Sequence, residues 1–141
     1  MRPRAASVRA AVALAAAALA LAGCSSRSDQ VRAKVTQFVH AVAGHDYRTL
    51  CRQVLAPSLL AHLEIYGLSC RQAMSIALRG VQDARVAIGP VRVHGSHASV
   101  DTITTARGQE ASLDAIELVD TRAGWRVDGL GTPVLTHAKR R

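Results

Sequence analysis

The side chains of this sequence that could carry chemistry include six histidines, three cysteines and ten carboxylates. His94 and His97 flank a predicted turn at Gly95–Ser96, and two imidazoles at this spacing could bind a metal ion. Protein zinc sites use three or four side-chain ligands, and no third ligand stands near this pair in the sequence. We therefore expect two exposed turn residues, and we expect His40 and His62 at the boundary of the core.

Sequence patterns for phosphate binding and for serine or redox chemistry are absent. The chain contains no glycine-rich phosphate loop, no Gly-x-Ser-x-Gly elbow and no Cys-x-x-Cys pair. No metal and no cofactor is predicted. A general-base enzyme stays possible, because such a site is assembled from residues across the whole fold.

Residues 1–23 have the composition of an export signal. Arg2, Arg4 and Arg9 carry the charge, and residues 10–23 form an uncharged run of 14 residues rich in Ala and Leu. A signal-peptide core needs roughly 7–15 apolar residues, whereas a stable membrane span needs about 20. We therefore expect a secretory signal and not a permanent transmembrane helix.

The end of this run, Leu21-Ala22-Gly23-Cys24, resembles the lipobox of bacterial lipoproteins. In that family the chain is cut before the cysteine, whose thiol receives a diacylglyceryl group. The resemblance implies a lipid on Cys24, a short tether over residues 24–28, and a location on the extracytoplasmic side of the cell membrane. Each buried CH₂ of an acyl chain contributes about 0.8 kcal/mol to such an anchor. The alternative is an ordinary signal peptide with a chance cysteine at its end.

Cys51 and Cys70 are the two cysteines that remain when Cys24 carries lipid. In an oxidising compartment two cysteines of a small domain more often pair than not. A bridge would close a loop of 20 residues, which the chain-entropy model values at about 3 kcal/mol. The alternative is two buried free thiols.

The formal charge of +8 belongs largely to the two ends of the chain. Cleavage after residue 23 removes three arginines and no carboxylate, which leaves about +5, and Lys139-Arg140-Arg141 carries three of those charges. The rest lacks the basic patch and the interleaved aromatic residues of a nucleic-acid-binding protein. Nucleic acid is therefore not an expected partner, and the basic tail is either solvated or touches anionic headgroups.

The periodicity of apolar residues predicts four helices followed by strands. A first helix capped by Asp29 runs to about Ala43, with apolar residues spaced for one face. Shorter helices are predicted over residues 46–55, 57–66 and 69–79. From about Ala84 the pattern predicts four strands joined by tight turns, with a bulge or bend at Gly89-Pro90. Helices followed by an antiparallel sheet make an α+β domain, which we expect over residues 29–132, with a basic tail at 133–141.

This order of elements resembles the nuclear-transport-factor-two-like superfamily, also called SnoaL-like. The matched features are the long first helix, the short helices that carry Cys51 and Cys70, the four strands, and the last-strand sequence of residues 124–129, Gly-Trp-Arg-Val-Asp-Gly. The resemblance implies helices packed in a curved four-stranded sheet, with an apolar cavity at the open end of the cone. Fold by itself does not assign a function.

Enzymes of this superfamily place acids and bases inside the cone, and Tyr47, Tyr66, Asp101 and Asp114 are the possible counterparts here. None of them aligns with a catalytic motif, so the catalytic residues are unknown. Strand alternation places Asp101 opposite the Val100 face, where a solvent-facing position is expected. The face of Asp114 is left open.

Two functions fit the sequence. The first is a non-enzymatic module of the cell envelope that binds a small apolar ligand or another envelope protein. The second is a small cofactor-independent hydrolase, dehydratase or isomerase in the cone. The first is favoured, because the residues expected to face the cone are mostly aliphatic. A cavity lined by two or more buried ionisable residues would favour the second.

Overall fold

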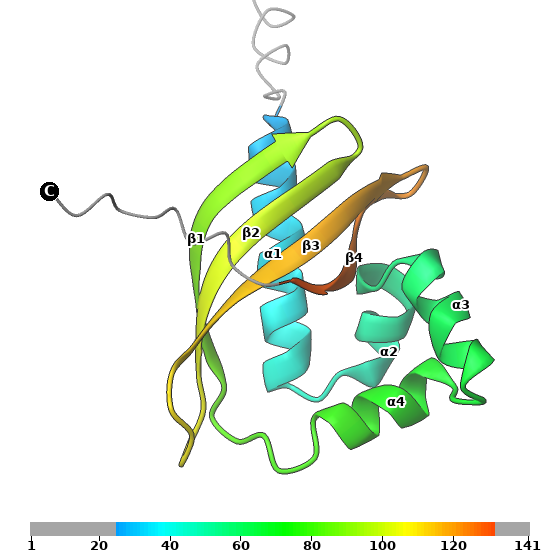
Figure 1. Cartoon of the computed structure of the whole chain (residues 1–141), viewed down its shortest axis with the longest axis vertical. Helices are drawn as coiled ribbons and strands as arrows, with labels where there is room; N and C mark the ends of the chain where they lie inside the picture. Colours follow the sequence, from blue (N-terminus) through cyan, green and yellow to red (C-terminus); the bar gives the residue numbers. More distant parts are fainter. Residues whose placement is uncertain (1–24, 132–141) are drawn as a thin grey trace, which may run out of the picture.

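The computed structural model describes residues 25–131, which fold as helices followed by one antiparallel sheet (Figure 1). The α+β class and the curved four-stranded sheet predicted from the sequence are confirmed. The helical elements are α1 (Arg27–Ala43), α2 (Tyr47–Thr49), the π-helical turn η1 (Leu50–Val54), α3 (Pro57–Ile65) and α4 (Cys70–Ala77). The strands are β1 (Arg85–His94), β2 (His97–Thr105), β3 (Ser112–Thr121) and β4 (Gly124–Gly131).

The N-cap of the long helix α1 lies three residues before the predicted one. Ser26, and not Asp29, is the N-cap: the Ser26 hydroxyl accepts a hydrogen bond from the backbone N–H of Asp29, whose carboxylate accepts one from the Ser26 N–H. This reciprocal capping box satisfies two backbone donors that the first helical turn cannot pair. The predicted cap at Asp29 is therefore wrong, and residues 27 and 28 of the predicted tether belong to the helix.

The short helices follow the predicted caps more closely. Asp46 accepts from the backbone N–H of Thr49, Pro57 occupies the first turn of α3, and Ser69 and Gln72 form the predicted capping box of α4. The segment predicted as one helix over residues 46–55 is instead a single turn of α2 followed by η1. Beyond η1 the chain runs beside the last strand, where the N–H of Ala56 donates to the carbonyl of Val127 at 2.7 Å.

The four strands pair in chain order, β1-β2-β3-β4, and every pair is antiparallel. The register shifts between Ile88 and Val91, which confirms the bulge predicted at Gly89-Pro90. A second shift lies between Glu117 and Leu118. Bulges bend a strand and increase its twist, so both irregularities favour the curvature of the sheet.

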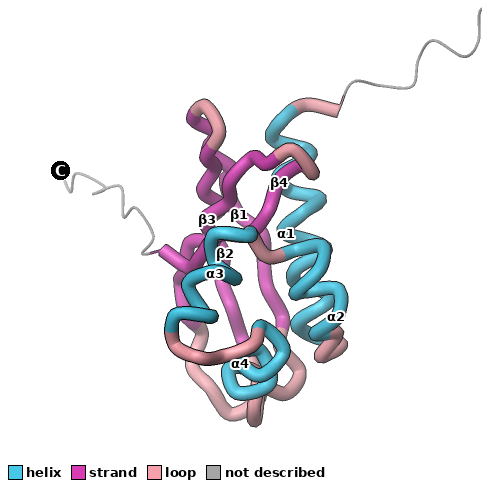
Figure 2. Tube along the Cα trace, turned by 90° about the vertical axis from the view of Figure 1, so that its right-hand side faces the viewer, coloured by secondary structure: helices cyan, strands magenta, loops and turns pink. Residues whose placement is uncertain are grey.

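The concave face of the sheet packs on α1, which contacts both outer strands, β1 and β4 (Figures 1 and 2). The short helices lie to one side, beside β4. Fully or almost fully buried aliphatic side chains form the core, from α1 (Val31, Val35), from η1 (Leu50, Val54) and from the inner faces of the strands (Val100, Ile116, Leu118, Val127). The sheet therefore shares one core with the helices.

The predicted signal peptide over residues 1–23, the lipid site at Cys24 and the basic tail at 133–141 lie outside the described residues. Within residues 25–131 no helix is long and apolar enough to cross a membrane.

Candidate ligand-binding cavity

A cavity of about 220 Å³ lies between the second half of α1, the segment that follows α4, and the open end of the sheet. Most of its lining is apolar. Those residues come from α1 (Phe38, Val42), from the end of α4 and the chain leading into β1 (Leu78, Val81, Ala84, Val86), and from the other strands and the β2–β3 turn (Ala106, Ile116, Leu130). The apolar cone cavity implied by the family resemblance is therefore present.

The polar residues of this lining are Thr102, Thr104, Gln109 and Asp114, and all four belong to the β2–β3 hairpin. Thr102 pairs with Asp114 across the two strands, so both side chains share the inner face of the sheet. Thr102 is 2% exposed, and its hydroxyl lies 3.4 Å from the backbone oxygen of Asp114. Asp114 is half-buried, and its carboxylate accepts a hydrogen bond of 2.7 Å from the Ser112 hydroxyl.

Asp101 lies on the outer face of the sheet, as strand alternation predicted. Arg92 of β1 binds it with two hydrogen bonds, of which the Nη1 to Oδ2 bond measures 2.8 Å. The hydrogen bonds from Arg92 hold the pKa of the Asp101 carboxyl below its usual range, and the same contact raises the pKa of Arg92. Asp101 is therefore part of a surface ion pair and has no access to the cone.

The structure does not bring the other predicted acids and bases to the cavity. Tyr47 is half-buried against the core beside the ring of His45, and Tyr66 is 69% exposed at the end of α3. His94 and His97 are exposed on either side of their turn, and the Ser96 hydroxyl lies 3.2 Å from Nδ1 of His97. Among residues 25–131 no three His, Cys, Asp or Glu side chains gather closely enough to hold a metal ion.

A second hollow of about 230 Å³ adjoins the cavity, because both are lined by Val42, Val81 and Ala84. Its polar residues come from three different loops: His45 after α1, Gln82 and Asp83 before β1, and Arg107 in the β2–β3 turn. Asp83 and Arg107 form an ion pair. No pattern in the sequence predicts this hollow, because no spacing links residues from loops so far apart in the chain.

The structure joins Cys51 in η1 to Cys70 at the start of α4, with their Cα atoms 5.9 Å apart. Both residues are half-buried, and Cys70 packs against the core. This geometry suits a disulfide. Oxidation of the pair in the exported protein stays a prediction.

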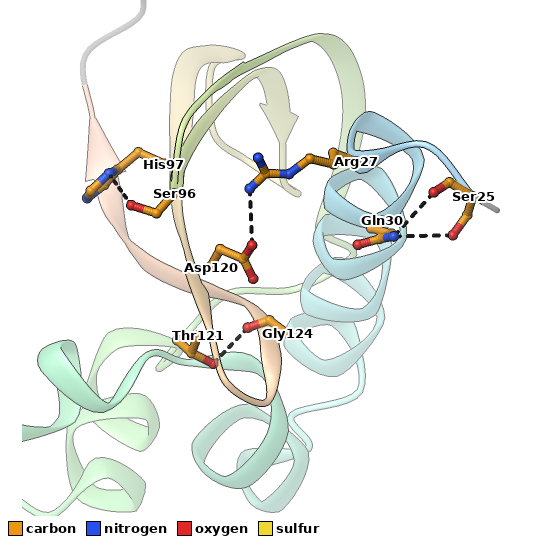
Figure 3. A network of polar contacts seen from close by, with 8 residues as sticks. All are labelled: Ser25, Arg27, Gln30, Ser96, His97, Asp120, Thr121 and Gly124. Carbon is orange, nitrogen blue, oxygen red and sulfur yellow. Dashed lines mark hydrogen bonds and ion pairs between the residues drawn. The ribbon is translucent and has the colours of Figure 1, made fainter.

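The beginning of α1 is bound to the sheet through Arg27, whose side chain points toward Asp120 in Figure 3. Arg27 forms an ion pair of 3.1 Å with Asp120 of β3, and its guanidinium carbon lies 5.2 Å from the centre of the Trp125 ring. Helical rise separates Arg27 from Val42 in the cavity lining by about 22 Å. The chain therefore enters the domain at one end of α1, and the cavity lies near the other end.

Comparison with known proteins relates the chain to solved structures. No protein-family model matches it, and no curated protein sequence matches it significantly. A proposed dehydratase of the NTF2-like family from Streptomyces avermitilis superposes with a TM-score of 0.54 at 20% identity, over 77% of this chain and 96% of that protein. An NTF2-like protein of unknown function from Shewanella baltica gives a TM-score of 0.52 at 12% identity, over 72% and 88% of the two chains.

At these identities the similarity establishes the fold and leaves the function open. The helix order, the four-stranded sheet and the cavity at its open end agree with the resemblance identified in the sequence. The chain therefore has the nuclear-transport-factor-two-like (NTF2-like) fold.

Proposed function

We propose that this protein is an exported lipoprotein, anchored by a lipid on Cys24 to the extracytoplasmic side of the cell membrane, that binds a small and mainly apolar ligand in its cone without transforming it. The observation that carries the proposal is the lining of the cavity, in which nine of the thirteen described residues are apolar. Binding sites for small molecules are typically concave and apolar, with a few polar groups that orient the ligand.

The size of the cavity limits the ligand. An apolar protein cavity of about 150 Å³ is large enough to bind benzene. By proportion the 220 Å³ of this cavity would take a body of about nine non-hydrogen atoms, such as a substituted single ring. Leu130 is 71% exposed although it lines the cavity, so the space opens to solvent and a ligand can enter without unfolding.

The polar groups of the cavity favour binding over catalysis. General acid–base chemistry needs a titratable group and a second polar group in reach of the reacting atoms. Among the described residues Asp114 is the one ionisable side chain of the lining, and its hydrogen-bond partner is the hydroxyl of Ser112. An enzyme of the cone would need Asp114 to act without a titratable partner in that lining.

Support for the anchor comes from residues 1–24, whose basic start, uncharged core and final Leu-Ala-Gly-Cys fit an exported lipoprotein. With α1 beginning at Arg27, at most a few residues separate the lipid from the folded domain. The start of α1 would then face the membrane, and the cavity about 22 Å along the helix would open away from the bilayer. Such a protein would take its ligand from the extracytoplasmic solution.

Ligand binding is tested with indole, which has nine non-hydrogen atoms, on the protein in phosphatidylcholine nanodiscs. Ile116 lines the cavity and Ile65 of α3 is 78% exposed outside it, so the two δ1 methyl groups report on cavity and surface in one NMR titration. We expect a saturable shift of Ile116 and little change at Ile65. Ala84→Leu should abolish the shift by filling the cavity, and Ala61→Leu on the exposed face of α3 should preserve it. Equal effects of both substitutions, or no saturable shift, would refute binding in the cone.

Anchoring is tested separately with Cys24→Ser. Without the thiol no diacylglyceryl group can be attached, so the variant should keep its leader or leave the membrane fraction. Membrane partitioning and processing identical to those of the unmodified protein would refute the lipoprotein assignment and leave the indole result unaffected.

A further inference from the structure

Three of the four polar residues in the described lining of the cavity lie on one wall. Thr102 and Thr104 of β2 and Asp114 of β3 share the inner face of the hairpin, and the rest of the lining, Gln109 apart, is apolar. A ligand in this space would therefore have one polar end against β2 and β3 and an apolar body against α1 and β1.

Asp114 determines the charge of that wall. Among the described side chains Ser112 alone donates a hydrogen bond to it, while an ionised carboxylate has about four acceptor sites. None of the ion pairs formed within residues 25–131 includes Asp114. On the outer face Asp101 has Arg92 as its partner, and in the adjoining hollow Arg107 is paired with Asp83.

A carboxylate that has no cationic partner among the described residues, and that lies beside a mainly apolar space, would select ligands by charge. Charge interactions are stronger next to low-dielectric walls than in water, so an anionic ligand is disfavoured. An ammonium group donates charge-assisted hydrogen bonds, which are roughly twice as strong as neutral ones. It would also supply the opposite charge that Asp114 lacks among the described residues.

We propose that the ligand of the cone is a small amine with an apolar body, whose ammonium group donates hydrogen bonds to the carboxylate of Asp114 while the body fills the apolar part of the cavity. This inference rests on the proposed ligand-binding function and adds the chemical class of the ligand. The Thr102 and Thr104 hydroxyls on the same wall provide further acceptors for the ammonium hydrogens.

The test uses three probes that share a phenyl ring and a short linker: 2-phenylethylamine, 2-phenylethanol and phenylacetate. Each is titrated at pH 7 into the protein in nanodiscs, and the Ile116 δ1 methyl shift gives the Kd. We expect the amine to bind most tightly and phenylacetate most weakly, with at least about a tenfold difference between them, as expected for one hydrogen bond to a charged group.

Asp114→Asn keeps the shape of the side chain and removes its charge. The Kd for 2-phenylethylamine should rise about tenfold or more, that for phenylacetate should fall, and that for 2-phenylethanol should change about twofold at most. Glu110→Gln is the matched control, because it removes one exposed carboxylate outside the cavity lining. It should leave all three values unchanged.

The outcomes separate the two proposals. If none of the three probes shifts Ile116, binding in the cone fails together with the amine assignment. If all three bind equally well, or if phenylacetate binds best, the amine assignment fails and the cavity keeps its binding function. The ranking in the unmodified protein decides between these results even if Asp114→Asn does not fold.

Discussion

The bridge between Cys51 and Cys70 gives a prediction for stability whose magnitude follows from its position in the chain. The two cysteines are separated by 19 positions and connect η1 to the start of α4, so the bridge encloses the whole of α3. In the chain-entropy model a loop of this length contributes about 3 kcal/mol to the free energy of unfolding, by restricting the unfolded chain. For a domain of about 100 residues this corresponds to a fall in Tm of roughly 12–24 °C when the bridge is lost.

The assay is thermal unfolding followed by circular dichroism, with and without a reducing agent. The double variant Cys51→Ser/Cys70→Ser should melt as low as the reduced protein, and the reducing agent should not lower its Tm further. In the unreduced exported protein a thiol reagent should label neither cysteine. Ready labelling of both residues in the folded state, or equal Tm values for the oxidised and reduced protein, would refute the bridge as a stabilising element.

Three further predictions concern the core, the bulge and the surface ion pair. Leu118 is 1% exposed, so Leu118→Ala should lower the free energy of unfolding by about 2–5 kcal/mol in urea titrations. A Cβ at Gly89 would lie 2.9 Å from the Asp101 carbonyl oxygen, whereas one at Gly129 would have no neighbour within 4 Å. Gly89→Ala should therefore lower the free energy of unfolding by about 1–3 kcal/mol, and Gly129→Ala should lower it much less. The pKa of Asp101 is lowered in the folded protein, so its carboxylate stabilises the folded state at pH values above the pKa of about 3.9 that it has in the unfolded chain. This contribution is lost as the pH falls through the pKa that Asp101 has in the folded protein. Between pH 5 and pH 2.5 the urea midpoint of the unmodified protein should consequently fall further than that of Arg92→Met; equal falls would show that the ion pair contributes nothing.

The elements predicted best are those that depend on local chemistry. Apolar spacing located α1 to within three residues, and the predicted caps at Asp46 and Ser69 agree with hydrogen bonds in the structure. The N-cap of α1 in the structure is Ser26. Ser, Asp and Asn are all favoured at an N-cap, so residue type alone did not distinguish Ser26 from Asp29. Two good caps three residues apart suit a capping box, and that pattern would have favoured the earlier start.

Predictions that depend on register were harder to make. Alternation along β2 placed Asp101 on the outer face correctly. The face of Asp114 was left open, because Leu113, Ile116 and Leu118 do not alternate. In the structure Leu113 is 48% exposed on the outer face, and Asp114 takes the inner face opposite Thr102. Because Leu113 is apolar but exposed, it breaks the alternation along β3. The sequence therefore did not predict that Asp114, the one carboxylate in the described lining of the cavity, faces inward.

The adjoining hollow depends on tertiary structure alone. His45, Asp83 and Arg107 come from separate loops, and the fold brings them to the same end of the sheet. Periodicity describes single helices and strands, so it carries no information on which loops meet. The residues of this hollow could be identified only once the strands were paired and α1 was packed on them.

A crystal structure of the protein grown with indole tests most directly whether the cone binds a small apolar body. We predict density for the ring system between Phe38 and Val42 on one side and Ile116 on the other, with the polar wall of Thr102 and Asp114 beside it. A cavity closed by its own side chains, or indole bound elsewhere on the surface while the cavity stays empty, would contradict the proposed function.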